Sequence, residues 1–285
     1  MKKKSLLKLF IFLLAFAMLA FVVGCGSTEE PVDTESGDDT EKSEAGDPDL
    51  EAENEADEKE VLLMGTNAGF IPFEFLNEDE EIDGFDIELA EEIASILGME
   101  LEVLDMDFGG LILAVKNGQI DIAVAGITIT EERLESVNFS DPYYVAGQTI
   151  VVREDETGIS GIEDLAGRLV GVQEGTTGDF ECDDLIEEGL FKSEDVRRFP
   201  QVNEVFLALE SGQVDAVIMD EPVANRYIEE RGGMKTIGGV FTEEEFGIAI
   251  AKENKELLEQ INAALKEIKD SGRYDELYEK WFINN

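Results

Sequence analysis

Two similar stretches decide the predicted fold of this chain: Leu113-Ala-Val-Lys-Asn-Gly-Gln-Ile-Asp-Ile-Ala-Val-Ala-Gly126 and Leu207-Ala-Leu-Glu-Ser-Gly-Gln-Val-Asp-Ala-Val-Ile-Met-Asp220. Each predicts the end of a helix, a turn at Gly-Gln, and a short apolar strand that begins at an aspartate. The two copies begin 94 positions apart (113 to 207), which is far longer than the repeat of a solenoid or a propeller. We therefore expect two similar α/β lobes, with a cleft that faces the carboxyl ends of their strands.

The segments around these stretches alternate between strand and helix patterns. Residues 61–65 form a short apolar run, and Phe85–Leu97 carries apolar residues at helical spacing, with Gly98 as the residue that ends the helix. The alternation predicts an α/β fold with mainly parallel sheets covered by helices. If a later apolar strand returns to the first lobe, the chain crosses between the lobes twice, near Gly147 and near Phe246. Two such crossings form a two-strand hinge.

Composition and pattern together divide the 285 residues into four parts. The first lobe is predicted to take residues 60–146 together with residues 245–285, and the second lobe residues 147–244. Residues 1–24 are predicted as a signal peptide, and residues 25–59 as an acidic tether. Each lobe has the size of an ordinary domain and is large enough to bury its own core.

The first 25 residues have the pattern of an export signal. Met1–Lys4 and Lys8 supply a basic start, Leu9–Val23 is almost wholly apolar, and small residues lead to Cys25. The apolar run is short for a stable bilayer span. The pattern resembles the lipobox of bacterial lipoproteins, which implies that Cys25 carries a lipid and anchors the exported protein to the outer face of the cytoplasmic membrane. The alternative is an uncleaved signal anchor with an incidental cysteine.

The stretch from Gly26 to Lys59 is rich in Glu, Asp, Ser, Thr and Gly and has only scattered apolar residues. Such a segment buries too little surface to offset the entropy of the chain, so we predict a disordered spacer that its own charge extends. A calcium site is the alternative, although the segment lacks a loop of the Asp-x-Asp-x-Asp-Gly type.

Charge and composition exclude several classes of function. A formal net charge of −45 is unsuited to nucleic acid, which needs clustered Lys and Arg, and to anionic lipid surfaces. The chain has no histidine, which excludes Ser-His-Asp and Cys-His catalysis and zinc sites that need imidazole. With Cys25 lipidated, Cys182 has no intramolecular partner, and we predict a small structural residue there. We expect neither a metal nor a cofactor.

Five motifs resemble those of a known receptor family, in the family's order. They are Gly65-Thr-Asn-Ala-Gly-Phe-Ile-Pro-Phe-Glu-Phe75, Gly84-Phe-Asp86, Ala125-Gly-Ile-Thr-Ile-Thr-Glu-Glu-Arg133, Phe139-Ser-Asp-Pro-Tyr-Tyr144 and Gly171-Val-Gln-Glu-Gly-Thr-Thr-Gly178. The resemblance is to the bacterial family 3 solute-binding proteins, which include glutamine-binding and lysine/arginine/ornithine-binding receptors. It implies a periplasmic-binding-protein-like fold of type II and a free polar amino acid as the ligand.

By this resemblance, Arg133, Thr128 and Thr177 hold the α-carboxylate of the ligand. The chemistry agrees, because a guanidinium presents paired N–H groups that fit carboxylate oxygens two at a time. The turn at Gly175–Gly178 precedes a predicted helix and offers further N–H groups to an anion. The alternative interpretations are a surface arginine that pairs with glutamate near a helix start, and a turn that only caps its helix.

Asp220 matches the family position that accepts the α-ammonium of the ligand, and the backbone carbonyl of Gly126, its counterpart in the first repeat, is expected to assist. A closed cleft needs such a carboxylate, because an unpaired buried ammonium is very costly. Helix capping ahead of Pro222 is the alternative. Phe70 and Phe108 match the aromatic pair that sandwiches the ligand's side chain, with core packing as the alternative.

Three positions depart from the glutamine-binding pattern: Asn67 replaces Asp, Gln173 replaces Lys and Met219 replaces His. Loss of the basic groups removes repulsion against a cationic ligand, and the amide oxygens of Asn67 and Gln173 can accept from guanidinium or ammonium donors. The acidic surface also speeds the capture of cations. Arginine or another basic amino acid is therefore modestly favoured over glutamine or another neutral polar one.

The leading hypothesis is a monomeric lipoprotein receptor, not an enzyme, that delivers its amino acid to the permease subunits of an ABC-type importer. The permease follows from the family resemblance alone. One rival is a dehydratase-like enzyme with Glu74 or Asp220 as general acid or base. The other is a sensor module, which we disfavour because no transmembrane helix or signalling domain follows Phe282 in this sequence.

Overall fold

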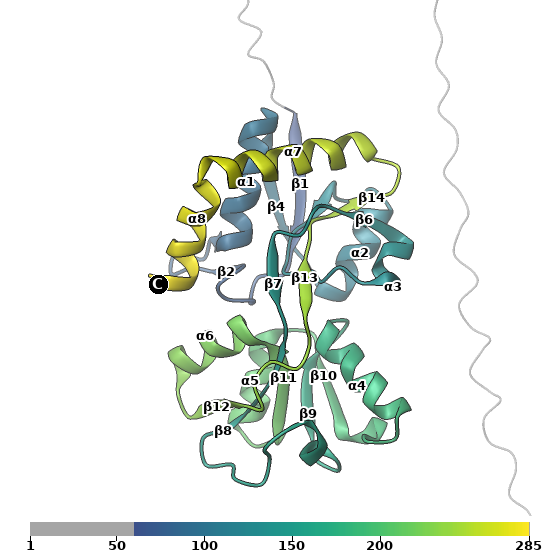
Figure 1. Ribbon diagram of the computed structural model, residues 1–285, viewed down its shortest axis with the longest axis vertical. Coiled ribbons are helices and arrows are strands. Elements are labelled where there is room, and N and C mark those ends of the chain that lie inside the picture. Colours follow the sequence, from purple (N-terminus) through teal and green to yellow (C-terminus); the bar gives the residue numbers. More distant parts are fainter. Residues whose placement is uncertain (1–59, 285) are drawn as a thin grey trace, which may run out of the picture. The chain divides into compact units, whose positions relative to one another are not determined.

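The computed structural model describes residues 60–284. The predicted signal peptide, the lipidated Cys25 and the acidic tether lie outside the described residues. Residues 60–284 form two five-stranded sheets and a two-stranded connection between them (Figure 1). The first lobe is the part built on the sheet that contains β1 (Val61–Thr66), and the second lobe is the part built on the sheet that contains β8 (Gln148–Arg153).

The two sheets have the same plan. The first has the strand order β4 (Glu100–Asp105), β1, β5 (Ile122–Ala123), β14 (Ala249–Ala251) and β6 (Val137–Phe139). The second has the order β10 (Val196–Phe199), β9 (Val170–Gln173), β11 (Ala216–Asp220), β8 and β12 (Met234–Ile237). In each sheet one strand runs against the other four, and that strand lies between the third and the fifth. The prediction of mainly parallel sheets is confirmed.

The reversed strands follow directly from the hinge. The short strands β7 (Tyr144–Ala146) and β13 (Glu244–Phe246) pair with each other, and they lead into β8 and β14 respectively (Figure 1). A chain that arrives from the opposite lobe meets the carboxyl ends of the parallel strands first, so it must enter the sheet antiparallel to them. The two-strand hinge is therefore the reason that each sheet contains one reversed strand.

Helices cover both sheets. In the first lobe they are α1 (Phe85–Leu97), α2 (Phe108–Lys116), α3 (Glu131–Ser136), α7 (Lys255–Ser271) and α8 (Arg273–Tyr278), which continues as a π-helical turn at Glu279–Ile283. The second lobe has α4 (Thr177–Glu187), α5 (Val202–Glu210) and α6 (Glu221–Arg231), with 3-10 turns at Ile162–Leu165 and Ser193–Asp195. A small hairpin of β2 (Phe75–Leu76) and β3 (Ile82–Asp83) precedes α1. As predicted, α1 ends at Gly98, whose φ of 74° is in the left-handed region.

The two sequence repeats adopt the same local structure. In the first repeat, Asp121 N–H donates to the carbonyl oxygen of Leu63 over 2.8 Å, and Asp121 Oδ2 accepts from Leu63 N–H over 2.9 Å. In the second repeat, Asp215 makes the same pair of bonds with Leu169, over 2.7 and 3.0 Å. Each aspartate thus fixes the register of its strand against the neighbouring parallel strand, and the strand of each repeat begins directly after this residue.

Two apolar runs contribute fewer residues to the main sheets than they contain. The run 246–250 divides into β13 and β14, because its first part pairs with β7 in the hinge and its last part joins the first sheet. Gly247 lies at the division, and a Cβ atom there would lie 2.9 Å from the side chain of Ile129. The run 120–125 contributes only Ile122–Ala123 to the ladder. Apolar composition shows that these residues are buried and does not show which sheet each one joins.

An aromatic cluster anchors both hinge strands to the first lobe. Phe73 is fully buried, and its ring centroid lies 4.9 Å from that of Tyr144 on β7 and 5.4 Å from that of Phe246 on β13. Phe282 adds a third ring at 5.2 Å, so the end of the chain packs on the same cluster. Edge-to-face contacts between buried rings stabilise a structure beyond the area that they bury.

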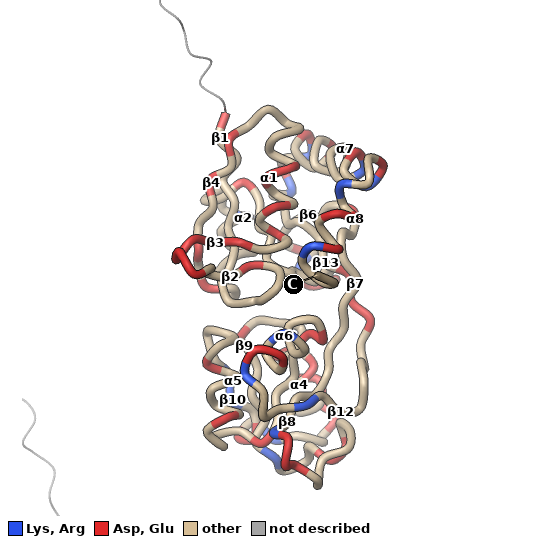
Figure 2. Tube along the Cα trace, turned by 90° about the vertical axis from the view of Figure 1, so that its left-hand side faces the viewer, with Lys and Arg blue, Asp and Glu red and all other residues tan. Residues whose placement is uncertain are grey.

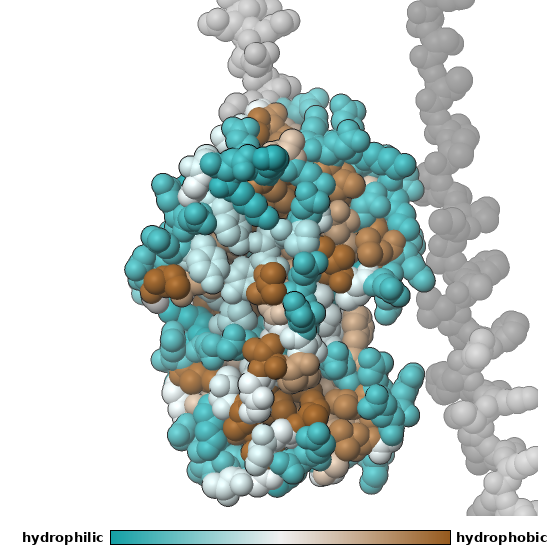
Figure 3. Space-filling view, in the orientation of Figure 1, coloured by the Kyte–Doolittle hydropathy of each residue, from teal (hydrophilic) through white to brown (hydrophobic). Residues whose placement is uncertain are grey.

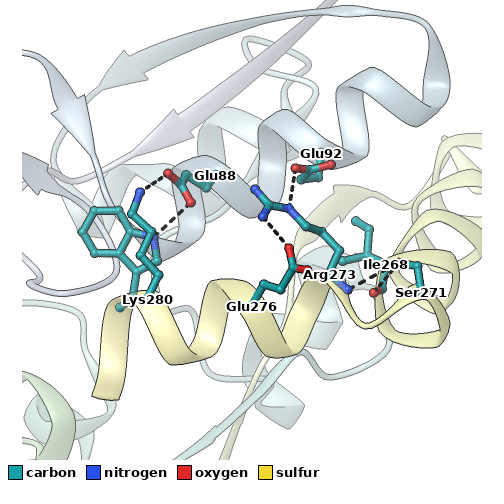
Figure 4. A network of polar contacts seen from close by, with 8 residues as sticks. Glu88, Glu92, Ile268, Ser271, Arg273, Glu276 and Lys280 are labelled. Carbon is teal, nitrogen blue, oxygen red and sulfur yellow. Dashed lines mark hydrogen bonds and ion pairs between the residues drawn. The ribbon is translucent and has the colours of Figure 1, made fainter. Parts of the chain in front are cut away.

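Polar contacts hold the final helices against α1 (Figure 4). Arg273 on α8 donates to Glu92 on α1 over 2.8 Å and to Glu276 over 2.9 Å. Lys280 pairs with Glu88, which also accepts from the indole N–H of Trp281 over 3.2 Å. These partly exposed pairs contribute little energy individually, so the buried aromatic cluster is the main anchor of this end.

The described surface is acidic and largely hydrophilic. Figure 2 shows acidic residues on both lobes and far fewer basic ones, and the face in Figure 3 is mostly hydrophilic with small hydrophobic groups among the polar residues. Within residues 60–284, no helix has both the length and the apolar character that a membrane crossing requires. The same residues contain no cluster of His, Cys, Asp and Glu side chains arranged to hold a metal ion.

Candidate functional site

The carboxyl ends of the central strands bring the predicted residues of the two lobes together. Asn67 follows β1 and Gln173 ends β9, and Gln173 Nε2 donates to Asn67 Oδ1 over 2.8 Å. Tyr227 on α6 donates from its hydroxyl to the carbonyl oxygen of Gly69 over 2.8 Å. The facing surfaces of the two lobes therefore touch directly at the position that the strand topology predicts.

Arg133 lies near the start of α3 and is 6% exposed. Its Nη1 donates to the carbonyl oxygen of Thr128 over 2.7 Å, and its Nη2 donates across the lobes to that of Gly175 over 3.0 Å. The rings of Phe108 and Phe180 lie 5.5 and 5.7 Å from the guanidinium carbon. Burial lowers the pKa of Arg133 to about 10, although the charges of Glu244 and Asp220 act to raise it. The side chain therefore stays charged at neutral pH. The interpretation of Arg133 as a surface residue is wrong.

The guanidinium keeps the capacity to bind an anion. Arginine has five N–H donors, and the two bonds to backbone carbonyls use two of them. The remaining donors lie in a buried setting, where a charge-assisted bond to a carboxylate is stronger than at an exposed surface.

The turn before α4 is partly occupied by its own capping. Thr176 accepts from the N–H of Asp179 over 3.3 Å, and Asp179 Oδ2 accepts from Gly175 N–H over 3.0 Å. The alternative interpretation of this turn as a helix cap therefore holds for Thr176. The N–H of Gly175 is already bonded to a carboxylate, so the parts of this turn that contact the other lobe are the carbonyl oxygen of Gly175 and the side chain of Thr177.

Thr128 and Thr177 meet at a third residue, Glu244 on the hinge strand β13. The hydroxyls of Thr128 and Thr177 each donate to Glu244 Oε2 over 2.7 Å, and the two hydroxyl oxygens lie 3.5 Å apart. Thr242 donates to Glu244 Oε1 over 2.8 Å. Gln148 Nε2 donates to the hydroxyl of Thr177 over 3.2 Å. Both crossing segments of the hinge thus contribute to one polar network that joins the lobes.

Asp220 is a buried carboxylate with an unsatisfied oxygen. It stands at the N-terminus of α6, but its side chain makes no capping hydrogen bond, so the capping interpretation is wrong for its carboxylate. Its Oδ1 is buried and has no hydrogen-bond partner among the described residues. Burial, with the charge of Glu244 as the next cause, raises the pKa of Asp220 from 3.8 to about 7. A cation beside this carboxylate would relieve both effects.

Two further buried carboxyl groups, those of Asp86 and Glu74, lie close to Gly126 and to each other. Asp86 Oδ2 accepts from Gly126 N–H and from the hydroxyl of Tyr143, both over 2.8 Å, while burial raises the pKa of Asp86 to about 6. Glu74 is fully buried, and burial together with the charge of Asp86 raises its pKa well above the usual range. Gly126 has φ 55°, and a Cβ there would lie 2.5 Å from the ring of Phe70, so this position requires glycine.

The two predicted aromatic residues have different surroundings. The ring of Phe70 lies 5.5 Å from that of Phe73 and 6.4 Å from that of Phe246, and the residue is 7% exposed. Phe108 begins α2, is half-buried, and faces the guanidinium of Arg133. Phe70 therefore has core contacts on one side, whereas Phe108 is placed beside the charged group of the site.

The amide pair Asn67 and Gln173 is part of a longer network. Asn67 Nδ2 donates to the carbonyl oxygen of Met106 over 2.8 Å and approaches Gln201 Oε1 at 3.5 Å. Gln173 Nε2 also donates to the carbonyl oxygen of Pro200 over 3.1 Å. The amide oxygen of Asn67, which we expect to face a cationic ligand, accepts here from Gln173 of the opposite lobe.

Sequence reasoning missed several residues of this interface, chiefly Glu244, Gln148 and Tyr227. Glu244 is the middle residue of an acidic run, which ordinarily predicts a solvated loop. One feature of the sequence could have predicted its burial: Glu244 lies two residues before the apolar Phe246. In a strand, residues two positions apart point to the same face, so both side chains turn inward. Two surface hollows, around Arg153 and Arg231 and around Tyr144 and Lys269, contain none of the predicted site residues.

Comparison with known proteins gives a consistent result. The model of the bacterial extracellular solute-binding proteins, family 3, matches residues 62–284. The arginine-binding extracellular protein ArtP of Bacillus subtilis (strain 168) is 40% identical over 228 residues, which cover 79% of this chain and 87% of ArtP. The ABC transporter glutamine-binding protein GlnH of the same organism is 38% identical over 205 residues, covering 70% and 73%.

Solved structures agree in fold. An ancestral arginine-binding protein bound to arginine superposes with a TM-score of 0.75 at 46% sequence identity, over 79% of this chain and 99% of that one. The similarity thus extends across both lobes and the hinge.

Proposed function

Because the chain belongs to the bacterial extracellular solute-binding proteins, family 3, we propose that it is the amino-acid receptor of an ABC-type importer. The proposal includes its location: the protein is exported, and a lipid on Cys25 holds it at the outer face of the cytoplasmic membrane. It acts as a monomer and delivers its ligand to the permease subunits.

One observation supports the choice of ligand class most strongly: the first lobe buries a guanidinium, and the second lobe buries a carboxylate with an oxygen that has no partner among the described residues. Arg133 belongs to the first lobe and Asp220 to the second, and each influences the pKa of the other. A zwitterionic amino acid supplies the two opposite charges that these groups lack. In this proposal Arg133, Thr128 and Thr177 hold the α-carboxylate, and Asp220 holds the α-ammonium with the carbonyl of Gly126.

The balance of charge favours a basic amino acid. Glu244 and Asp220, both buried, act to raise the pKa of Arg133, whose guanidinium is the only one that is buried in the described part of the chain. A ligand with an additional positive charge lowers the energy of this acidic region, whereas a ligand with a negative side chain raises it. The arginine-binding relatives support this choice, and the glutamine-binding relative supports the alternative of a neutral polar ligand.

The remaining residues complete the proposal. Phe70 and Phe108 hold the ligand's side chain between them, and Asn67 and Gln173 accept from its polar end. The proposed lobes are residues 60–146 with 245–285 and residues 147–244. Binding begins on one lobe, and closure adds the contacts of Thr177 and Asp220, so that the closed form is favoured only by the bonds made in it.

A thermal-shift screen of the twenty amino acids with ornithine, citrulline and cystine tests the function, since a ligand of the native state raises the melting temperature. We expect the largest shift with arginine. Arg133→Ala should abolish the shift and leave the far-UV circular dichroism unchanged. Arg197→Ala, at an exposed arginine of the second lobe, is the matched control. No shift with any compound, or an unchanged affinity of the Arg133→Ala variant in calorimetry, would refute the proposed site.

An enzyme on this scaffold is the rival function. Glu74 and Asp220 have raised pKa values, as a general acid requires, but burial, with a neighbouring carboxylate as the next cause, accounts for both. Incubation of the protein with each compound that shifts its melting temperature, followed by chromatography, separates the two functions. A receptor returns its ligand unchanged, and any turnover would favour the enzyme.

A further inference from the structure

Glu244 occupies the centre of the predicted carboxylate site. Its side chain comes from the hinge strand β13, is 7% exposed, and accepts hydrogen bonds from one threonine of each lobe. Those residues, Thr128 and Thr177, are the two that we propose as donors to the ligand's α-carboxylate. A carboxylate of the protein itself is thus bonded to both of them.

A hydroxyl group has only one hydrogen to donate. In this arrangement the hydrogens of Thr128 and Thr177 both point to Glu244 Oε2, over 2.7 Å each. Neither threonine can donate to a second carboxylate while Glu244 holds this position. A second carboxylate at the same place would also lie within a few ångströms of the charge of Glu244, which raises its energy further.

We propose that Glu244 is a built-in competitor for the ligand's carboxylate, which must displace it from Thr128 and Thr177 in order to bind. The inference rests on the proposed function and adds a determinant of affinity to it. The apparent affinity for an amino acid is reduced by the fraction of molecules in which Glu244 holds the two hydroxyls. The same residue makes the site selective, because only a ligand with a strong anionic group gains the two hydroxyls in exchange.

The substitution Glu244→Gln separates competition from simple packing. A glutamine has the same shape, and its amide oxygen can still accept from both threonines while its amide N–H groups donate to Thr242. The bonds to a neutral oxygen are roughly half as strong as those to a carboxylate, so the ligand displaces glutamine more easily. Glu245→Gln is the matched control, because Glu245 is the next residue of the same strand and is exposed.

The experiment measures the affinities of wild type, Glu244→Gln and Glu245→Gln for L-arginine and for L-argininamide by calorimetry. Argininamide keeps both positive groups and lacks the carboxylate, so it does not compete with Glu244. We expect Glu244→Gln to bind arginine about tenfold more tightly, which corresponds to about 1.4 kcal/mol. We expect no gain for argininamide, so the ratio of the two affinities rises at least tenfold, and we expect no change in Glu245→Gln.

The outcomes distinguish this inference from the proposed function. If wild type binds no amino acid, the proposed function fails and the inference fails with it. If the screen selects another amino acid, that compound and its α-amide take the place of the arginine pair. If wild type binds but the affinity ratio of Glu244→Gln is unchanged or lower, Glu244 only packs in the hinge or attracts cations, and the inference alone is wrong. Far-UV circular dichroism and the melting temperature establish that the variant is folded.

Discussion

Asp220→Asn should make the protein more stable and unable to bind its ligand. Asp220 is buried, one of its oxygens has no partner among the described residues, and its pKa is raised from 3.8 to about 7. An asparagine keeps the shape and removes the charge. The site therefore keeps a carboxylate that costs folding energy, and the proposed reason is that the ligand's ammonium compensates for it.

The magnitude follows from the pKa. Each pKa unit corresponds to about 1.36 kcal/mol, so a carboxyl whose pKa rises from 3.8 to about 7 costs the folded state up to about 4 kcal/mol at pH 8. Because the folded-state pKa is raised, the associated stability is present below about pH 4 and is lost as the pH rises to about 7. The stabilisation by Asp220→Asn should therefore be only about 1 kcal/mol at pH 4.5 and largest at pH 8.

Urea unfolding of both proteins at pH 4.5 and pH 8, followed by circular dichroism, measures this difference. In thermal unfolding of a fold of this size, about 1 kcal/mol changes the melting temperature by about 2–4 °C. A rise of roughly 10 °C is therefore expected for Asp220→Asn at pH 8. Calorimetry with arginine should show no binding by the variant. A variant that is less stable than wild type at pH 8, or one that still binds arginine with full affinity, would refute the reasoning.

Three further substitutions test the packing around the site. Gly126→Ala should cost about 2–4 kcal/mol in urea unfolding, because its Cβ would lie 2.5 Å from the ring of Phe70 at a φ of 55°; a loss below 0.5 kcal/mol would contradict this. Asp215→Ala removes the side-chain acceptor of Leu169 N–H, which helps to fix its strand, and should cost about 1–3 kcal/mol in the same assay without changing ligand affinity in calorimetry. Tyr143→Phe removes a donor to buried Asp86 and raises the pKa of that carboxyl further above about 6, so its loss of stability should be larger at pH 8 than at pH 5; equal losses at both values would exclude this linkage.

Much of the fold was readable from local patterns. The paired Gly-Gln-x-Asp turns predicted two equivalent lobes, and the structure confirms that Asp121 and Asp215 fix their strands in the same way. The end of α1 at Gly98 and the direction of most strands were also predictable. These features depend on interactions within a few residues or between neighbouring elements, and periodicity records them directly.

The site was predictable in part. Arg133, Asp220 and Gly126 were predicted as site residues because they match family motifs at strand and helix ends, and their role in binding stays a prediction. The state of each group was not predictable: the sequence does not show that Asp220 lacks a capping bond, or that the N–H of Gly175 is bonded to Asp179. Capping residues and ligand-binding residues are the same amino-acid types, so only the surrounding atoms distinguish the two roles.

The sequence by itself determined the repeat, the alternation of strands and helices, and the acidic character of the chain. The tertiary structure alone decided that Glu244, one carboxylate of an acidic run, turns inward and reaches Thr128 and Thr177 across separations of 116 and 67 residues. The physical reason is that burial and hydrogen bonding of such a side chain depend on how two lobes and a hinge meet, and no local pattern of residues contains that geometry.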